Sequence, residues 1–594
     1  MTRTGSPRLL LGLAAVAVAF AAADTYVVVL ALPEMMGATG IPIDQLQRAA
    51  PIVSGFLLGY VAMLPLIGRI ADLRGRLPVL VAALVVFAAG SLVTALAYDL
   101  PSMVTGRFLQ GVGGGGLVPA TLALVADLYP VERRGVPLGI VSAVQELGSV
   151  IGPLFGALVI SVADWRTIFL INLAVGLVLA AALRAARDTR EAGAAGASPG
   201  DERSPGPPGR FDWGSPLLLL VTLGFGALVF VQPNELVTDI TWGELFLPFA
   251  GDGRWLTPVG LVTIVAFLLF LVRSATASRP MLDLAGWARS SREADLRGAL
   301  LLAVALGGVI LAFATADPQV QVFSDRGLWY LAAAAVAAVA FVLHLRSAQA
   351  PLVPPGALRQ RPAWGAILVS FFVGSALIAA LIDIPIYART TTYRTSQLMA
   401  ALVLVRFLVA LPIGAVVGGY LIRTRGAGPV TAVGMTMSAT GFFLMSRWGI
   451  DSLEDPTSNI ALVLCGFGFG LALAPVNAAV LAHTDAGVHG LASAMVVVAR
   501  MVGMLVGISA LTTIGLRRYY AEQDGLPTVT EVCGKAEMCQ DFRDLQKLAG
   551  VAQEQTVFLG AAFCALAAAV VALVVFRGAA TRAVAAHHAV RSLG

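Results

Sequence analysis

Charged residues are rare in the apolar stretches of this sequence, and four of them have types that could form two ion pairs. Asp24 and Glu146 are carboxylates, and Arg406 and Arg500 are arginines. An unpaired charge in hydrocarbon is costly, so each of these side chains is expected to face a partner or a cavity. A carboxylate that takes up a proton when its ion pair breaks can couple proton movement to a change in shape. The residue types therefore indicate proton-linked ion-pair chemistry.

Depth along the expected helices indicates how these four residues pair. At a rise of about 1.5 Å per residue, Glu146 and Arg500 lie about 16 and 17 Å from the cytoplasmic ends of their helices. Asp24 and Arg406 lie about 24 and 23 Å from theirs. We therefore expect Glu146 to pair with Arg500 and Asp24 with Arg406, with one residue of each pair from each half of the chain. The first pair would be a lock that opens when Glu146 is protonated, and Asp24 would be a second proton carrier. The alternative is that both pairs are static contacts of little net value.

The segment around Glu146 also contains a stripe of small residues. Gly148, Gly152 and Gly156 recur at every fourth position, with Pro153 among them, so the glycines share one side of a helix. Glu146 points about 120° away from the centre of that stripe. Because small residues allow membrane helices to pack closely, we expect the stripe to pack within its own half of the chain.

The composition is that of a membrane protein. Of the 594 residues, 58% are hydrophobic and 13% are charged, and the mean hydropathy is +0.84. Soluble proteins carry about 25% charged residues. The net charge of +5 is explained by membrane topology and does not point to a nucleic-acid partner. These values predict an all-α polytopic membrane protein.

Apolar runs of about 18 residues or more divide the chain into membrane spans. The sequence predicts sixteen spans, with fourteen as the alternative. They form an N-terminal six-helix bundle, a cytoplasmic linker, four linker helices in two hairpins and a C-terminal six-helix bundle. The respective ranges are 1–185, 186–213, 214–363 and 364–594. Placing both termini in the cytoplasm puts most of the 40 Lys and Arg residues on that side, as the positive-inside rule requires.

A polar segment near the C-terminus, 517–555, is expected to form a periplasmic loop. It contains Cys533 and Cys539, and an extracytoplasmic location permits a disulfide between them. No histidine lies in this segment, so we expect no zinc site there.

Two further motifs lie at or near the ends of spans. The loop after the second span contains Gly68, Asp72, Gly75 and Arg76 in a GxxxDxxGR spacing. Glycines allow a tight turn, and an aspartate can cap a helix or pair with a neighbouring arginine. A generic basic loop is the simpler interpretation, but the spacing favours a specific role. The second motif, in the fourth span, places an arginine before a run of glycines: Arg107, Gln110 and Gly111.

These motifs resemble those of the major facilitator superfamily. The 68–76 loop is similar to that superfamily's signature between spans two and three, and the 148–156 segment is similar to its antiporter motif. The chain also resembles the fourteen-span drug:proton antiporter branch and, within it, the mycobacterial triacylglyceride exporters that act beside a lipoprotein. The resemblance implies a major facilitator fold, with Asp24, Glu146 and Arg500 as functional charges. The segments that carry the closer resemblance are 24–29, 40–43, 145–150, 410–415 and 496–501.

The sequence thus predicts a monomeric secondary exporter of the cytoplasmic membrane that is driven by the proton gradient and needs no cofactor. A mostly apolar cavity suits triacylglyceride-like lipids or lipophilic drugs, and a periplasmic lipoprotein is a partner implied by the resemblance. The alternatives are a multidrug:proton antiporter with no lipid role, a lipid enzyme and a non-transporting scaffold. The expected spans contain no HExxH or GxSxG motif and no histidine cluster, which disfavours the enzyme.

Overall fold

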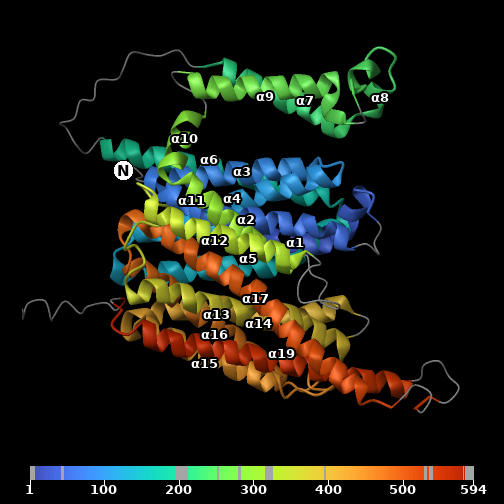
Figure 1. Ribbon diagram of the computed structural model, residues 1–594, viewed down its shortest axis with the longest axis vertical. Helices are drawn as coiled ribbons and strands as arrows, with labels where there is room; N and C mark the ends of the chain where they lie inside the picture. Colours follow the sequence, from blue (N-terminus) through green and yellow to red (C-terminus); the bar gives the residue numbers. More distant parts are fainter. Residues whose placement is uncertain are drawn as a thin grey trace, which may run out of the picture.

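The chain folds into helices that lie side by side along most of its length (Figure 1). The computed structural model describes residues 7–41, 46–195, 212–250, 253–277, 282–314, 326–393, 396–527, 532–533, 540–579 and 581. Within these ranges the regular structure is helical throughout. The predicted all-α class is therefore confirmed.

The first six long helices form one bundle. Helix α4 packs against α2 and α3, and α1 packs against α5. Between α2 and α3 the chain turns at Gly75, whose φ of 96° lies in the left-handed region that favours glycine. The Asp99 side chain accepts a hydrogen bond from the Ser102 amide at 2.9 Å and so caps α4. The bounds are α1 (Pro7–Ala38), α2 (Leu46–Arg74), α3 (Arg76–Ala95), α4 (Leu100–Leu128), α5 (Gly135–Val162) and α6 (Arg166–Ala195).

The last six long helices form a second bundle of the same size. Helix α13 packs against α17 and α19, α14 against α16, and α15 against α16 and α19. The bounds are α13 (Arg361–Thr390), α14 (Gln397–Arg425), α15 (Ala427–Met445), α16 (Ser458–Ala482), α17 (His489–Asp524) and α19 (Gln540–Val575).

Two helices of the second bundle are unusually long, which corrects the expected loop over 517–555. Helices α17 and α19 each have 36 residues, or about 54 Å at 1.5 Å per residue, and a bilayer core is about 30 Å thick. They project beyond the other helices at one end of the molecule (Figure 1). Much of the segment is therefore helical. Cys533 is disulfide-bonded, whereas Cys539 lies outside the described residues.

The helices between the bundles form two hairpins with different surroundings. Helix α7 (Gly214–Val231) packs on α9 (Pro258–Thr276), and this pair stands apart from the bundles in Figure 1. Helix α11 (Leu296–Ala314) packs on α12 (Gly327–Ser347) and contacts both α2 and α17, so it bridges the two bundles. A short helix, α10 (Leu284–Glu293), connects the hairpins. In the expected linker, α6 runs to Ala195, and residues 196–211 lie outside the described part of the chain.

Fourteen helices among the described residues are long and apolar enough to cross a membrane. Two more long helices, α5 with 28 residues and α15 with 19, occupy the remaining positions at which the sequence predicts a span. Both pack inside the bundles, α5 against α1 and α15 against α16. The structure is therefore that of a multi-pass membrane protein.

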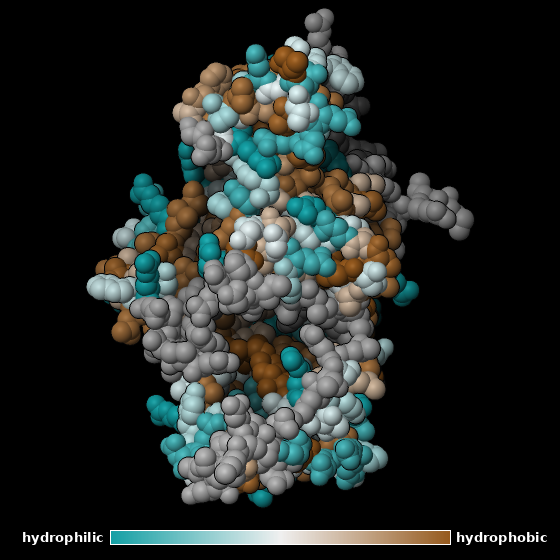
Figure 2. Space-filling view, turned by 90° about the vertical axis from the view of Figure 1, so that its right-hand side faces the viewer, coloured by the Kyte–Doolittle hydropathy of each residue, from teal (hydrophilic) through white to brown (hydrophobic). Residues whose placement is uncertain are grey.

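The two bundles touch at the end of the molecule that carries the α2–α3 loop, here called the α2–α3 end. A methyl group added to Gly68 of α2 would lie 2.6 Å from the Gly490 carbonyl oxygen at the start of α17. One added to Gly139 of α5 would lie 2.6 Å from the Ala415 carbonyl oxygen of α14. The opposite end, seen in Figure 2, has an apolar hollow at the level of the boundary between the bundles. The helices are thus closed together at one end.

Candidate functional site

Glu146 and Arg500 face each other across the boundary between the bundles. Glu146 comes from α5 and Arg500 from α17, and each residue is 8% exposed. Arg500 Nη1 lies 3.9 Å from Glu146 Oε1. This distance brings opposite charges together but exceeds that of a hydrogen bond. The predicted pairing is therefore present, and the two groups are held close without being locked in a short bond.

Both residues lie in the wall of a cavity between the bundles. The cavity has a volume of about 310 Å³ and is lined by α1, α2, α4 and α5 on one side and by α13 and α17 on the other. Its lining is mainly aliphatic and aromatic, with Glu146, Arg500 and Arg107 as the charged members. The remaining lining residues are Ala22, Thr25, Val53, Phe56, Leu57, Tyr60, Val61, Gln145, Ser149, Leu377, Ile378, Ile382, Met501, Met504, Leu505 and Ile508.

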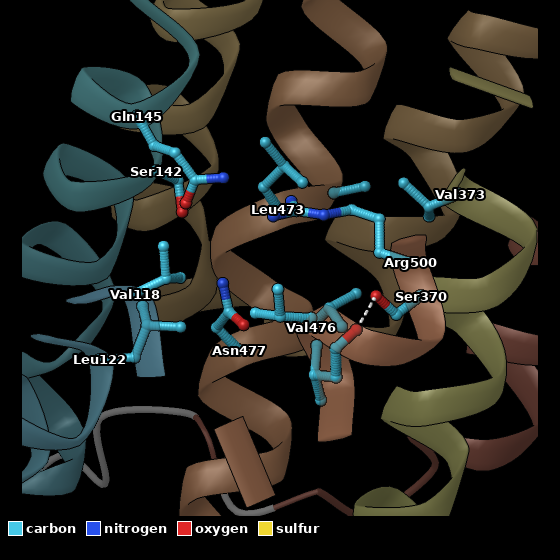
Figure 3. Close-up of a pocket in the computed structure, with 13 residues that line it drawn as sticks. Val118, Leu122, Ser142, Gln145, Ser370, Val373, Leu473, Val476, Asn477 and Arg500 are labelled. Carbon is cyan, nitrogen blue, oxygen red and sulfur yellow. Dashed lines mark hydrogen bonds between the residues drawn. The ribbon is translucent and has the colours of Figure 1, made fainter. Parts of the chain in front are cut away.

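A smaller and more polar pocket lies beside Arg500, as Figure 3 shows. Gln145 and Ser142 of α5 and Asn477 of α16 line it, and it shares Gln145 and Arg500 with the larger cavity. The Ser370 hydroxyl donates to the Val496 carbonyl at 2.8 Å and fixes α13 to α17 there. Arg500 thus stands between an apolar cavity and a group of side-chain amides and hydroxyls.

Asp24 is bonded inside its own bundle, so the predicted pairing with Arg406 is wrong. Arg107 Nη1 donates to Asp24 Oδ2 at 2.7 Å, and Asn172 Nδ2 donates to Asp24 Oδ1 at 2.5 Å. Asp24 and Arg107 are 2% and 1% exposed. Equal depth along two helices does not determine which sides of those helices face each other. The two residues that satisfy Asp24 come from α4 and α6, which contact α1 in the same bundle.

Further hydrogen bonds hold Arg107 in place. Its Nη1 also donates to Gln110 Oε1 at 2.9 Å, and Gln110 Nε2 donates to the Ser91 hydroxyl of α3 at 2.8 Å. The guanidinium carbon of Arg107 lies 4.4 Å from the centre of the Phe56 ring, in cation–π geometry. Gly111, which follows Gln110, lets α2 pack closely on α4. A methyl group added to Gly111 would lie 2.1 Å from the Phe56 carbonyl oxygen of α2. The fourth-span motif therefore builds a rigid polar network at the wall of the cavity.

Arg406 has a different partner. Its Nη1 donates to Asn459 Oδ1 of α16 at 2.8 Å, and the residue is partly exposed. Both residues belong to the second bundle. Among the described residues, the bond of Arg406 therefore lies within the second bundle.

The glycine stripe of α5 packs against α1. Methyl groups added to Gly148 and Gly152 would lie 2.2 Å from the Ala19 and 2.5 Å from the Ala23 carbonyl oxygens, and one added to Gly156 would lie 2.7 Å from a methyl of Val27. Both helices belong to the first bundle. Pro153 also lies in α5, but its side chain is not among those described. The stripe sets the α1–α5 distance, as expected, and leaves Glu146 free to face α17.

The segment 68–76, expected as a loop, is instead the end of α2, a turn at Gly75 and the start of α3, and it makes polar contacts between the bundles. Asp72 accepts hydrogen bonds from the amides of Gly490 and Leu491 at 2.7 and 3.0 Å, at the first turn of α17. A carboxylate is favourable there because a helix N-terminus carries partial positive charge. Arg76 Nη2 donates to Asp72 at 3.0 Å and to the Ala486 carbonyl at 2.7 Å. These bonds close the α2–α3 end.

Arg74, the last residue of α2, binds the linker instead. It pairs with Asp283, which precedes α10, and its guanidinium carbon lies 4.5 Å from the centre of the Trp287 ring. The hydrogen bond from Arg74 holds the pKa of Asp283 below its usual value. The loop that closes the two bundles is therefore also attached to the linker helices.

Sequence reasoning missed several polar members of these networks. No sequence pattern indicated that Asn172 bonds to Asp24. Tyr60, which is 6% exposed and lines the central cavity, and Ser91, which anchors Gln110, gave no signal beyond being polar in an apolar span. Among the described residues, no group of three or more His, Cys, Asp or Glu could hold a metal ion.

Comparison with known proteins agrees with the fold. Residues 14–349 match the family model of the Major Facilitator Superfamily. Among solved structures, the human organic anion transporter MFSD10 has a TM-score of 0.53 at 13% identity, with 95% of this chain and 99% of that chain covered. The proton:xylose symporter XylE has a TM-score of 0.51 at 12% identity, with 94% of each chain covered. At these identities the likeness extends to the fold alone.

Mycobacterial relatives are much more similar in sequence. A triacylglyceride transporter of Mycolicibacterium hassiacum is 34% identical over 514 residues, which cover 85% of this chain and 78% of that protein. A triacylglyceride transporter of Mycobacterium tuberculosis is 34% identical over 527 residues, covering 86% and 83%. The chain therefore belongs to the major facilitator superfamily. It is a membrane transporter and not an enzyme.

Proposed function

We propose that this protein exports triacylglyceride-like lipids in exchange for protons, with Glu146 as the proton carrier. The observation that carries the proposal is the position of the Glu146–Arg500 pair in the wall of an apolar cavity between the bundles. When Glu146 is protonated, its attraction to Arg500 is lost, and the bundles can rock about the cavity. The relatives named as triacylglyceride transporters support a lipid as cargo.

The charge distribution supports an orientation for this exchange. The α2–α3 end carries the basic loop with Arg69, Arg74 and Arg76, so we assign it to the cytoplasm together with both termini. The closed α2–α3 end would then be the cytoplasmic gate, and the α17–α19 projection would reach into the periplasm. The protein would act as a monomer in the cytoplasmic membrane, and this projection is where a lipoprotein partner would receive the cargo.

The same cavity would also admit lipophilic drugs, which is the second candidate function. Its aromatic and methionine lining, with Phe56, Tyr60, Met501 and Met504, adapts to ligands of different shape. Glu146, once separated from Arg500, would offer a carboxylate to a lipophilic cation, and the apolar walls suit a neutral lipid.

Reconstitution separates these candidates. Purified protein in liposomes is given a fluorescent triacylglyceride analogue or a lipophilic cationic dye, and transfer is followed with and without an imposed pH gradient. We expect gradient-dependent transfer of the lipid analogue, abolished by a protonophore. Dye transfer without lipid transfer would support the multidrug antiporter, and transfer of either cargo that ignores the gradient would contradict proton coupling.

A further inference from the structure

A second pair of acidic residues lies in the C-terminal bundle, outside the lining of the central cavity. Asp383 belongs to α13 and Glu554 to α19, and these helices pack against each other. The two residues are 6% and 1% exposed. Their carboxyl groups are hydrogen-bonded to each other. The pair therefore joins two helices through a buried contact between two acids.

The two residues lie at the same level of the bundle. Asp383 is about 33 Å along α13 from Arg361, and Glu554 is about 32 Å along α19 from Val575. These two helix ends are adjacent, because a methyl group added to Gly365 would touch the Val575 side chain. The contact thus sits toward the α17–α19 projection, one residue from Ile382, which lines the central cavity.

The described surroundings supply no positively charged partner to this pair. Among the described residues, no Lys, Arg or His forms an ion pair with either carboxyl, and Gln553 Nε2 is 3.4 Å from Glu554 Oε1. Glu554 Oε2 is buried and has no hydrogen-bond partner. On α13 the next titratable group is Tyr387, whose hydroxyl donates to the Gly449 carbonyl. Other titratable or charged groups on the helices packed against α13 and α19, or in the adjoining loops, include Arg389, Arg406, Arg447, Asp451, Cys465, Arg500, Arg517, Arg518, Tyr519, Tyr520, Glu522, Lys547 and Cys564.

The chemistry of this contact requires a bound proton. Two ionised carboxylates have no hydrogen to donate to each other, and their like charges repel when no cation is near. A hydrogen bond between two carboxyl groups therefore needs a proton on one of them. The unpartnered Oε2 atom fits a carboxyl group whose charge is neutralised by that proton, because a buried charged oxygen without a partner is costly.

We propose that Asp383 and Glu554 form a proton-binding site, separate from Glu146, whose proton ties α13 to α19. Loss of the proton would leave two negative charges in contact in apolar surroundings and would drive the two helices apart. Because Ile382 follows any movement of α13 at this level, the site would change the shape of the central cavity. The site does not depend on the proposed transport function.

Infrared spectroscopy of the full chain in lipid nanodiscs tests this site directly, because a protonated carboxyl has a C=O stretch distinct from that of a carboxylate. We expect wild type at neutral pH to show a protonated-carboxyl band that the double variant Asp383→Asn/Glu554→Gln lacks. Asp451→Asn, which removes an exposed carboxyl, should keep the band. An equal band in wild type and in the double variant would overturn the proposal.

A single substitution keeps the test decisive if the double variant does not fold. In Asp383→Asn the amide can still donate to Glu554, so the helices stay joined. The proton then has a different hydrogen-bond partner, and we expect the band to shift or disappear. An unchanged band in Asp383→Asn would show that the proton is elsewhere. Failure of lipid transport in proteoliposomes would leave either result intact, because the band reports proton binding alone.

Discussion

The Nη1 atom of Arg500 lies 3.9 Å from the Oε1 atom of Glu146, across the boundary between the two bundles. The 2.7 Å bond from Arg107 to Asp24, by contrast, lies within one bundle. A loose pair in a cavity wall can open without leaving a charge in hydrocarbon, whereas a tight buried pair holds helices together. The two acids that look equivalent in the sequence therefore have different roles in the structure.

The Asp24 network should be chiefly structural. Replacing Asp24 with Ala leaves the Arg107 guanidinium buried without its counter-charge, so we expect a loss of about 3–5 kcal/mol of stability. Unfolding of the purified protein in detergent measures this. Arg406→Gln is the control, because that arginine is partly exposed and bonds only to Asn459 among the described residues. Equal losses in both variants would contradict the assignment.

The glycine stripe should not tolerate even one methyl group. In Gly148→Ala the new methyl would lie 2.2 Å from the Ala19 carbonyl oxygen, so α1 and α5 must separate. Overpacking of this kind costs about 1–3 kcal/mol, to be read from the thermal midpoint in detergent. Gly12→Ala on α1 is the matched control, since a methyl group there meets nothing within 4 Å. A Gly148 variant as stable as the Gly12 variant would disprove the close contact.

The attachment of α10 to the α2–α3 loop should depend on pH. The pKa of Asp283 is lowered by Arg74. The attachment is therefore fully present above the ordinary aspartate pKa of about 3.9 and is lost as the pH falls through the lowered value. The protection of amides 284–293 from hydrogen exchange, relative to the intrinsic rate at each pH, should be high at neutral pH and fall on acidification, while Asp283→Asn should show low protection at both. A protection factor that does not change with pH in wild type would rule this contact out as the cause.

Much of this architecture follows from local sequence patterns. The helix positions follow from apolar run length, and the packing of Gly148, Gly152 and Gly156 follows from their spacing. The pairing of Asp24 did not follow, because depth along a helix fixes the level of a residue but not which neighbour its side chain faces. The helical extension of α17 and α19 was also missed, because polar residues there suggested a loop. Glu554 lay in that segment, so its contact with Asp383 was hidden.

Closure of the α2–α3 end should depend on Asp72. In Asp72→Ala the amides of Gly490 and Leu491 lose their acceptor, and the favourable charge at the α17 N-terminus is removed. We expect this end to open more often, seen as longer spin-label distances between the α2–α3 loop and the start of α17. Arg74→Ala, which affects the linker contact, should leave that distance distribution unchanged. Longer distances in Arg74→Ala, with unchanged distances in Asp72→Ala, would show that the linker contact and not Asp72 holds this end closed.

Transport by Glu146→Gln in proteoliposomes tests the central claim most directly. The glutamine has the same size but cannot exchange a proton or attract Arg500 as a charge. The account predicts that this variant loses cargo movement driven by a pH gradient but still exchanges labelled for unlabelled cargo at equilibrium, with Asp451→Asn behaving as wild type. Gradient-driven transport at the wild-type rate in Glu146→Gln would contradict the role of the Glu146–Arg500 pair as a proton-sensitive lock.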